Sequence, residues 1–143
     1  MVTTDEANDL ATKWGSAFTS YAHGEKDGIW AAMFADGCVM TLPGEHQQAG
    51  LAGTKLVVYK EGIPDEVQDG YVPVTLEAMQ GKMVAQLEAV NYEKTEGSSK
   101  GVQGDKFILE YSRTNKDGEV YHVGYCLATV NSDLLFTDML IFS

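Results

Sequence analysis

Arginine is almost absent from this chain of 143 residues, in which Arg113 is the only one. The 10 basic residues are outnumbered by 21 acidic ones, so the formal net charge at pH 7 is −11. A chain this acidic repels phosphate backbones and anionic lipid headgroups, which argues against nucleic-acid and membrane partners. A single guanidinium also argues against ligands with several phosphate or carboxylate groups. Lysine cannot form the two parallel hydrogen bonds with which arginine binds such groups. We therefore expect a small ligand that is apolar or weakly polar.

Cysteine is also scarce. Cys38 and Cys126 fall in predicted strands, without the Cys-x-x-Cys or Cys/His spacing of a zinc site. We expect two buried free thiols, no metal and no cofactor.

Long apolar runs, repeats and interdomain linkers are missing as well. No apolar run approaches the ~18 residues that a membrane span requires. The N-terminal residues lack the basic start and apolar centre of a secretory signal. These absences predict a cytoplasmic protein with a single domain over residues 1–143.

The first segment has the pattern of an amphipathic helix from about Asp5 to Ala22. Thr3 and Glu6 have the spacing of a capping box. The apolar residues fall within a face roughly 120° wide at 100° per residue: Ala7, Leu10, Ala11, Trp14, Ala17, Phe18 and Tyr21.

Two further short helices are predicted. The first, over residues 29–34, is capped by Asp27 and ends before a strand at Cys38–Leu42, which Pro43 terminates. The second is predicted over residues 53–61 and ends at Gly62.

From residue 71 onward the pattern is typical of strands, in parts of 71–79 and then over 83–93, 106–114, 120–130 and 134–142. Asp117-Gly118 predicts a hairpin turn, and the Gly- and Ser-containing segment 95–104 predicts a mobile loop. Helices followed by antiparallel strands indicate an α+β fold, with the helices on one face of a curved sheet that encloses a cavity.

Three motifs give this order of elements a family resemblance. They are W-x3-F from Trp14, D-G-I-W-A-A-M-F-A-D-G-C-V-M-T-L-P from Asp27, and L-V-V-Y-K-E-G from Leu56. Together they resemble the NTF2-like superfamily, and within it the SnoaL-like polyketide cyclase and ketosteroid isomerase branches. The resemblance implies a cystatin-like cone, in which three N-terminal helices pack on a strongly curved, mostly antiparallel sheet. It also implies a homodimer formed through the outer face of the sheet.

The same resemblance leaves the activity open, because the superfamily includes isomerases, cyclases, dehydratases, binding proteins and docking modules. The catalytic base of the ketosteroid isomerase branch corresponds to Leu42, which cannot accept a proton. Its two oxyanion donors correspond to Ala17 and Cys126, neither of which supplies a comparable hydrogen bond. Tyr59 matches a tyrosine that supports the oxyanion hole in that branch.

Alternation along the last two strands predicts the polar groups of the cavity. If Cys126 points inward, as its match implies, His122 does so too. The match also makes the face of Asp138 the pocket face, where burial would raise the carboxyl pKa. The predicted catalytic residues are therefore Asp138, His122 and Tyr59, in a cofactor-independent isomerase, cyclase or dehydratase acting on a polyketide-, terpenoid- or steroid-like compound. The predicted substrate-binding residues are Trp14, Phe18, Tyr21, Trp30, Met33, Phe34, Leu42, Cys126, Phe136, Leu140 and Phe142.

Plainer interpretations remain open. A register shift of one residue would turn Asp138 to the sheet surface, where it could pair with Arg113 or a lysine. His122 could be structural, and the aromatic residues could be ordinary core. The protein could then be a non-catalytic binding protein or a dimeric docking module. Its outer sheet face would carry the residues that alternate with Asp138, namely Leu135, Met139 and Ile141.

Overall fold

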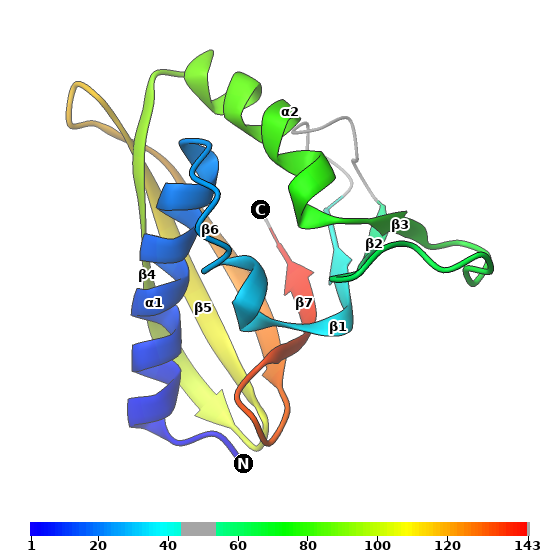
Figure 1. The fold of residues 1–143 in the computed structure, drawn as a ribbon. Coiled ribbons are helices and arrows are strands. Elements are labelled where there is room, and N and C mark those ends of the chain that lie inside the picture. The colour runs from blue at the N-terminus through cyan, green and yellow to red at the C-terminus, as the bar shows by residue number, and fades with distance from the viewer. Residues whose placement is uncertain (44–53, 143) are drawn as a thin grey trace.

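The computed structural model describes residues 1–43 and 54–142. Its elements are α1 (Thr4–Ala22), a 3-10 turn (Ala31–Met33), β1 (Phe34–Thr41), β2 (Lys55–Val58), β3 (Val72–Val74), α2 (Leu76–Glu88), β4 (Tyr92–Gln103), β5 (Lys106–Asn115), β6 (Val120–Val130) and β7 (Phe136–Ile141) (Figure 1). No described helix is both long and apolar enough to cross a lipid bilayer.

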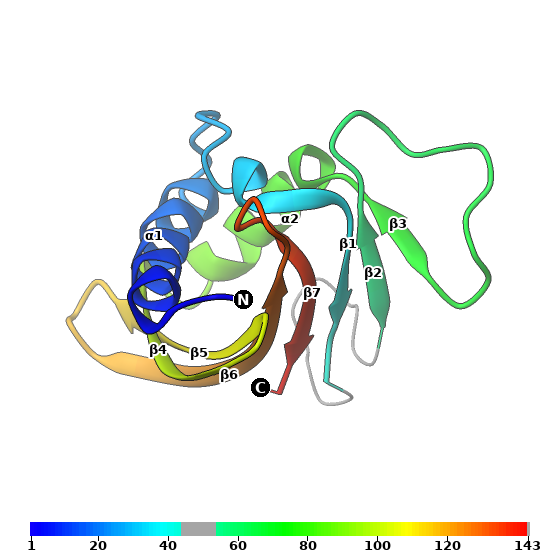
Figure 2. The same cartoon turned by 90° about the horizontal axis from the view of Figure 1, so that it is seen from below.

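The described strands form one mixed sheet in the order β3-β2-β1-β7-β6-β5-β4. β1 pairs with β7 and β2 with β3 in parallel, and the other neighbours are antiparallel. The sheet is strongly curved, and α1 lies inside the curve, against β4 and β5 (Figure 2). α2 lies beside α1 and reaches toward β2 and β3 (Figure 1). The predicted α+β class with a curved sheet is confirmed.

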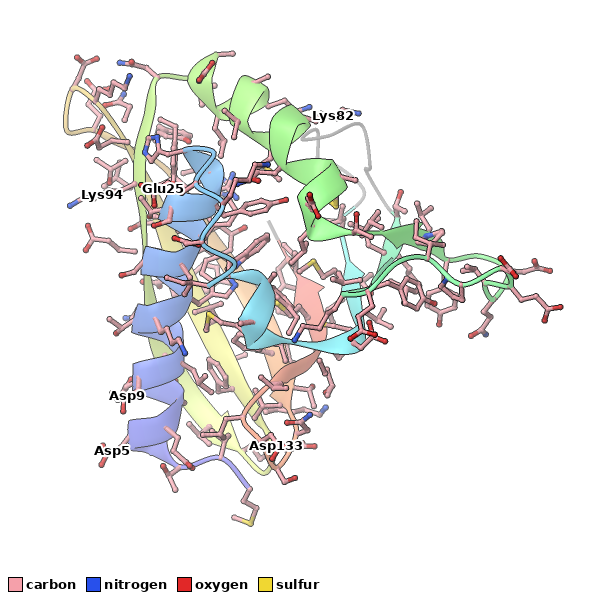
Figure 3. The ribbon with its side chains drawn as sticks, viewed as in Figure 1. Asp5, Asp9, Glu25, Lys82, Lys94 and Asp133 are labelled. Carbon is pink, nitrogen blue, oxygen red and sulfur yellow. The ribbon has the colours of Figure 1, made fainter. Side chains whose placement is uncertain are left out.

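The first predicted helix is confirmed as α1. The Thr3 hydroxyl accepts a hydrogen bond from the Glu6 N–H at 3.0 Å, and the Glu6 carboxylate accepts one from the Thr3 N–H at 2.9 Å. This is the predicted capping box. Asp5 and Asp9 lie on the exposed side of the helix and point away from the sheet (Figure 3). The apolar stripe therefore faces the core.

The other two predicted helices are wrong. Residues 29–34 contain only the 3-10 turn, because Gly28 adopts a φ of +71° and β1 already begins at Phe34, which leaves room for a single turn. Within residues 53–61, of which residue 53 lies outside the described residues, the chain forms β2. The run Leu56-Val57-Val58 is buried throughout, as in a strand covered on both faces, and β-branched residues favour that conformation.

The second helix of the described chain lies where strands are predicted. Residues 72–74 do form β3, but residues 76–88 form α2, so the predicted strand at 83–93 is wrong. The hydroxyl of Thr75 caps this helix by accepting a hydrogen bond from the Ala78 N–H at 3.2 Å. The residues of α2 are mostly strong helix formers. The helix was not predicted because its apolar residues do not form a clear stripe along one face.

The predicted mobile loop at residues 95–104 is also wrong, because nearly all of it belongs to β4 and pairs with β5. One of its glycines serves packing: a Cβ at Gly97 would lie 2.3 Å from the Ala11 carbonyl oxygen in α1. A Cβ at Gly15 would lie 2.7 Å from the backbone nitrogen of Gly97. The strand needs glycine there so that α1 can approach its backbone closely.

The hairpin between β5 and β6 is confirmed. Gly118 adopts a φ of +85°, and its N–H donates to the Asn115 carbonyl at 3.0 Å. The Asn115 side chain accepts hydrogen bonds from the N–H groups of Asp117 and Glu119. The strands predicted at 106–114, 120–130 and 134–142 correspond to β5, β6 and β7.

Candidate functional site

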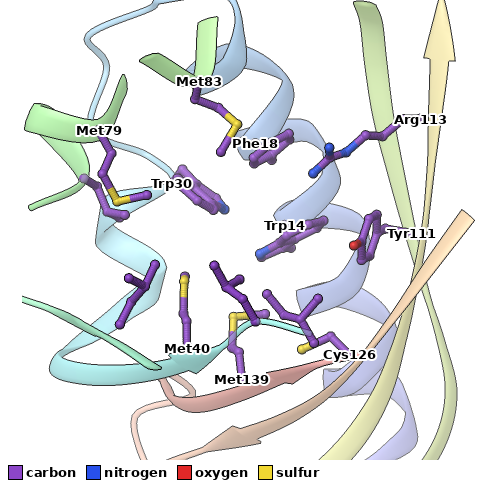
Figure 4. A pocket seen from close by; sticks show the side chains of 14 residues that line it. Trp14, Phe18, Trp30, Met40, Met79, Met83, Tyr111, Arg113, Cys126 and Met139 are labelled. Carbon is purple, nitrogen blue, oxygen red and sulfur yellow. The ribbon is translucent and has the colours of Figure 1, made fainter. Parts of the chain in front are cut away.

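The candidate site is a cavity between α1, α2 and the concave face of the sheet (Figure 4). One part of its wall is aliphatic: Met40, Leu42, Leu56, Leu76, Met79, Met83, Met139 and Ile141. The other part is aromatic or polar: Trp14, Phe18, Trp30, Tyr111, Arg113 and Cys126. A mostly apolar wall with a few convergent polar groups is typical of a small-molecule site.

The cavity is small. The space that the centre of a water molecule can occupy is about 70 Å³. Pockets for drug-sized ligands measure about 300–1,000 Å³, so a steroid or polyketide would enter only if the methionine side chains moved. The geometry favours a ligand smaller than a steroid.

The aromatic side chains of the wall pack against one another. The rings of Trp14 and Phe18 are stacked with centroids 5.5 Å apart, and Phe18 meets Trp30 edge to face at 5.1 Å. Tyr111 lies 5.4 Å from Trp14. These contacts fix the positions of the rings, so this wall is preorganised.

Arg113 brings a formal charge to this wall. Its guanidinium lies 5.1 Å from the ring centre of Phe18 and 5.5 Å from that of Tyr111, both in cation–π geometry. Only 7% of the residue is exposed. Figure 4 shows the guanidinium directed from β5 toward the interior of the cavity.

The remaining polar groups of the wall are protonated. Burial raises the pKa of the Tyr111 hydroxyl, which the charge of Arg113 offsets only in part. Burial also raises the pKa of the Cys126 thiol, with a smaller contribution from Cys38. The predicted buried free thiols are confirmed. Among the described lining residues, none can accept a proton near neutral pH.

The predicted orientation of Asp138 is wrong. Asp138 lies opposite Thr129 of β6, whereas the next pair, Met139 and Ala128, is buried against the core. Phe136 also points inward, so two residues separate consecutive inward side chains where strict alternation has one. The cause is a register irregularity at this point of the β6–β7 ladder, and beyond it every prediction from alternation changes face.

The neighbours of Asp138 in β7 also lie on the opposite face from the one predicted. Leu140 and Phe142, predicted to line the cavity, are 36% and 49% exposed and lie on the outer face. Met139 and Ile141, predicted for the outer face, line the cavity instead.

His122 does lie on the concave face, in register with Arg113 of β5. Its ring centre is 5.8 Å from that of Tyr111. Asp138 pairs with Thr129, which is seven residues further along β6, or roughly 23 Å at 3.3 Å per residue. The predicted acid/base pair of Asp138 and His122 is therefore not formed.

Tyr59 lies outside this cavity, in a second, more open cleft of about 750 Å³. Tyr21 reaches the same cleft, and its hydroxyl donates to the Leu76 carbonyl. The buried Gln80 amide donates to the carbonyls of Tyr21 and Glu25 and so holds α2 against the end of α1. Trp30 and Leu76 line both spaces.

The other predicted binding residues divide into two groups. Trp14, Phe18, Trp30, Leu42 and Cys126 line the cavity. Met33, Phe34 and Phe136 are buried in the core without lining it. No set of three possible metal ligands comes together anywhere in residues 1–43 and 54–142.

No family model matches this chain, and no curated protein matches it either. Among solved structures it is similar to a SnoaL-like protein of unknown function from Burkholderia thailandensis, with a TM-score of 0.59 and 15% identity over 99% of this chain and 98% of that one. This chain has the SnoaL-like fold. The fold implied by the resemblance of the sequence motifs is confirmed.

Two other solved structures are RV0760c from Mycobacterium tuberculosis and an NTF2-like protein of unknown function from Exiguobacterium sp. 255-15. The first has a TM-score of 0.51 and 14% identity over 100% of this chain and 94% of that chain. The second has a TM-score of 0.45 and 15% identity over 97% and 96%. At 14% identity the likeness to RV0760c shows the fold alone, so the chemistry of the site must be argued from this chain's own residues.

Sequence reasoning missed Arg113 and Tyr111 as parts of the SnoaL-like cavity. The signal was present, because Phe107, Leu109, Tyr111 and Arg113 occupy alternate positions of one predicted strand. The strand places all four on its buried face. The methionines of α2 were missed because that segment was predicted as strand.

Proposed function

We propose that the protein binds a small, mostly apolar molecule in the SnoaL-like cavity without transforming it. The observation that supports this is a wall whose described residues offer hydrogen-bond donors but no base. Trp14, Trp30 and Arg113 carry only donors, while Tyr111 and Cys126 remain protonated. A proton-transfer enzyme needs an acceptor within hydrogen-bond reach of the substrate.

Catalysis is the second candidate, and it would depend on His122. This histidine faces the concave side beside Arg113 and Tyr111, so its imidazole is the base nearest to the aromatic wall among the predicted catalytic residues. Isomerisation, cyclisation or dehydration would then require His122 to reach the ligand past Tyr111.

Native mass spectrometry of the protein purified from its source distinguishes the two candidates. A binding protein retains a molecule smaller than a steroid, and this molecule is released intact on denaturation. Conversion of that molecule on prolonged incubation with fresh protein, and loss of the conversion in His122→Gln, would contradict simple binding.

Two neighbouring positions in β7 provide a matched test of where the ligand binds. Ile141 lines the cavity, whereas Leu140 lies on the outer face. Ile141→Trp fills the space and should abolish retention of the ligand, while Leu140→Trp should retain it. Circular dichroism checks that both variants fold, since overpacking costs about 1–3 kcal/mol. Retention by Ile141→Trp would mean that the ligand binds elsewhere.

We also propose that the protein forms a homodimer through the outer face of the sheet. This face exposes apolar side chains from two adjacent strands, β6 and β7: Val123, Tyr125, Leu140 and Phe142, exposed by 46%, 40%, 36% and 49%. The Phe142 N–H continues the ladder by donating to the Tyr125 carbonyl. Contiguous exposed apolar side chains of this kind are typical of interfaces.

A further inference from the structure

The cavity contains two hydrogen-bond donors that no described residue satisfies. The indole nitrogens of Trp14 and Trp30 are buried, and neither donates to any atom of residues 1–43 and 54–142. Both residues are 6% exposed, and the ring centres are 6.4 Å apart. Figure 4 shows the nitrogen ends of both indoles directed into the cavity.

Such donors need an acceptor. A buried N–H without a partner costs about 1–3 kcal/mol, and natural proteins avoid this cost except where a ligand, an ion or water completes the site. The wall supplies no carboxylate to serve as that acceptor, because no Asp or Glu is among the described lining residues. Because no described residue accepts from the two indoles, the bound molecule or water is left as the acceptor.

Arg113 narrows the kind of acceptor. Its guanidinium lies over the rings of Phe18 and Tyr111 and faces the same space as the two indoles. A planar guanidinium matches a carboxylate with two parallel hydrogen bonds, which a neutral carbonyl cannot offer. The low-dielectric surroundings strengthen attraction to an anion and repel a cation.

We propose that the ligand is a small apolar carboxylic acid, with its carboxylate against Arg113 and the indole N–H groups of Trp14 and Trp30. Its apolar part then lies among the methionine and leucine side chains of the opposite wall. This inference rests on the proposed binding function and adds the chemical class of the ligand. The small size of the cavity favours an acid with no more than one ring and a short arm.

Calorimetric titration with three molecules of similar size that share a phenyl ring tests the chemical class of the ligand. Phenylacetate, phenylacetamide and 2-phenylethylammonium place an anion, a neutral amide and a cation on the same ring. We expect phenylacetate to bind at least tenfold more tightly than phenylacetamide, and the ammonium compound to show no binding.

Substitutions test whether Arg113, Trp14 and Trp30 cause the preference for the acid over the amide. Arg113→Met should bring the affinity ratio of acid to amide close to one, whereas Lys106→Met, the same kind of change at an exposed lysine, should leave the ratio unchanged. Trp14→Phe and Trp30→Phe keep an aromatic ring but remove the N–H, and each should weaken phenylacetate binding about three- to tenfold. These two variants provide the test if Arg113→Met does not fold.

The titrations distinguish the proposed acid class of the ligand from the proposed binding function. Equal affinity of the wild type for phenylacetate and phenylacetamide, or tighter binding of the ammonium compound, overturns the acid class and leaves the binding function in place. Failure of all three molecules to bind overturns both. A preference for the acid that survives in Arg113→Met, Trp14→Phe and Trp30→Phe overturns the assignment of these donors.

Discussion

At the scale of single residues, the cavity is defined by where a few polar side chains are buried. A cation is expensive to bury, and this chain buries its only arginine against aromatic rings rather than at the surface. Arg113 contacts the faces of Phe18 and Tyr111, whose quadrupoles offset part of that cost. The cavity is thus positively polarised inside a protein whose net charge is strongly negative.

The two cysteines should be unreactive in the folded protein. Burial raises the pKa of Cys38 from 9.0 to about 12, and Asp138 adds to this shift. We expect iodoacetamide at pH 8 to modify neither thiol in the native protein and both in urea, because the thiolate is the reactive form. Mass spectrometry counts the added groups, and rapid native modification would contradict the burial of the thiols.

The raised pKa of Cys38 predicts a lower free energy of unfolding at alkaline pH. Below about pH 9 the Cys38 thiol is protonated in both states, so its contribution to stability is complete. As the pH rises toward 12, the unfolded chain releases this proton and the folded chain keeps it, which favours unfolding. At pH 10 this amounts to about 1 kcal/mol for one thiol. Urea unfolding of wild type and Cys38→Ala at pH 8 and 10 measures the difference, which should be smaller in the variant.

At the scale of helices and strands, the sequence correctly predicts features that depend on residues close together in the chain. The capping box, the apolar stripe of α1 and the hairpin turn at Gly118 are local, and each was predicted correctly. Short buried segments are ambiguous, so β2 resembled a helix and α2 resembled strands. The orientation of Asp138 depends on one register irregularity between β6 and β7, which alternation alone does not reveal.

The contact between α1 and β4 gives the prediction at this scale. Gly97→Ala should lower the free energy of unfolding by about 1–3 kcal/mol, because its Cβ would collide with the Ala11 carbonyl. Gly101→Ala is the matched control in the same strand, since nothing lies within 4 Å of its Cβ position. Urea unfolding monitored by circular dichroism measures both variants. Equal stability of the two would mean that the helix can shift freely on the strand.

At the scale of the whole molecule, the curved sheet has two faces with different roles. The concave face and the helices enclose the cavity, and the convex face of β6 and β7 exposes Val123, Tyr125, Leu140 and Phe142. The motifs predicted this shape because they identify a fold. They left the site open because relatives at 14–15% identity share a backbone and not a set of side chains.

The exposed convex face predicts the oligomeric state. We expect sedimentation to give the mass of a dimer at micromolar concentration. Val123→Lys combined with Leu140→Asp should give a monomer, because charged side chains would be buried in the interface. The exposed Lys82→Ala on α2, away from the sheet, serves as the control (Figure 3). A wild-type mass that stays monomeric at all concentrations would contradict the dimer.

The position of the tryptophans has a practical consequence. The chain has two, Trp14 and Trp30, and both form part of the cavity wall. Their emission is sensitive to the polarity and hydrogen bonding of the indole, so an occupant of the cavity should alter the fluorescence of the entire protein. The unlabelled molecule is in this way its own optical sensor, and compound collections can be screened against it by intensity or wavelength alone.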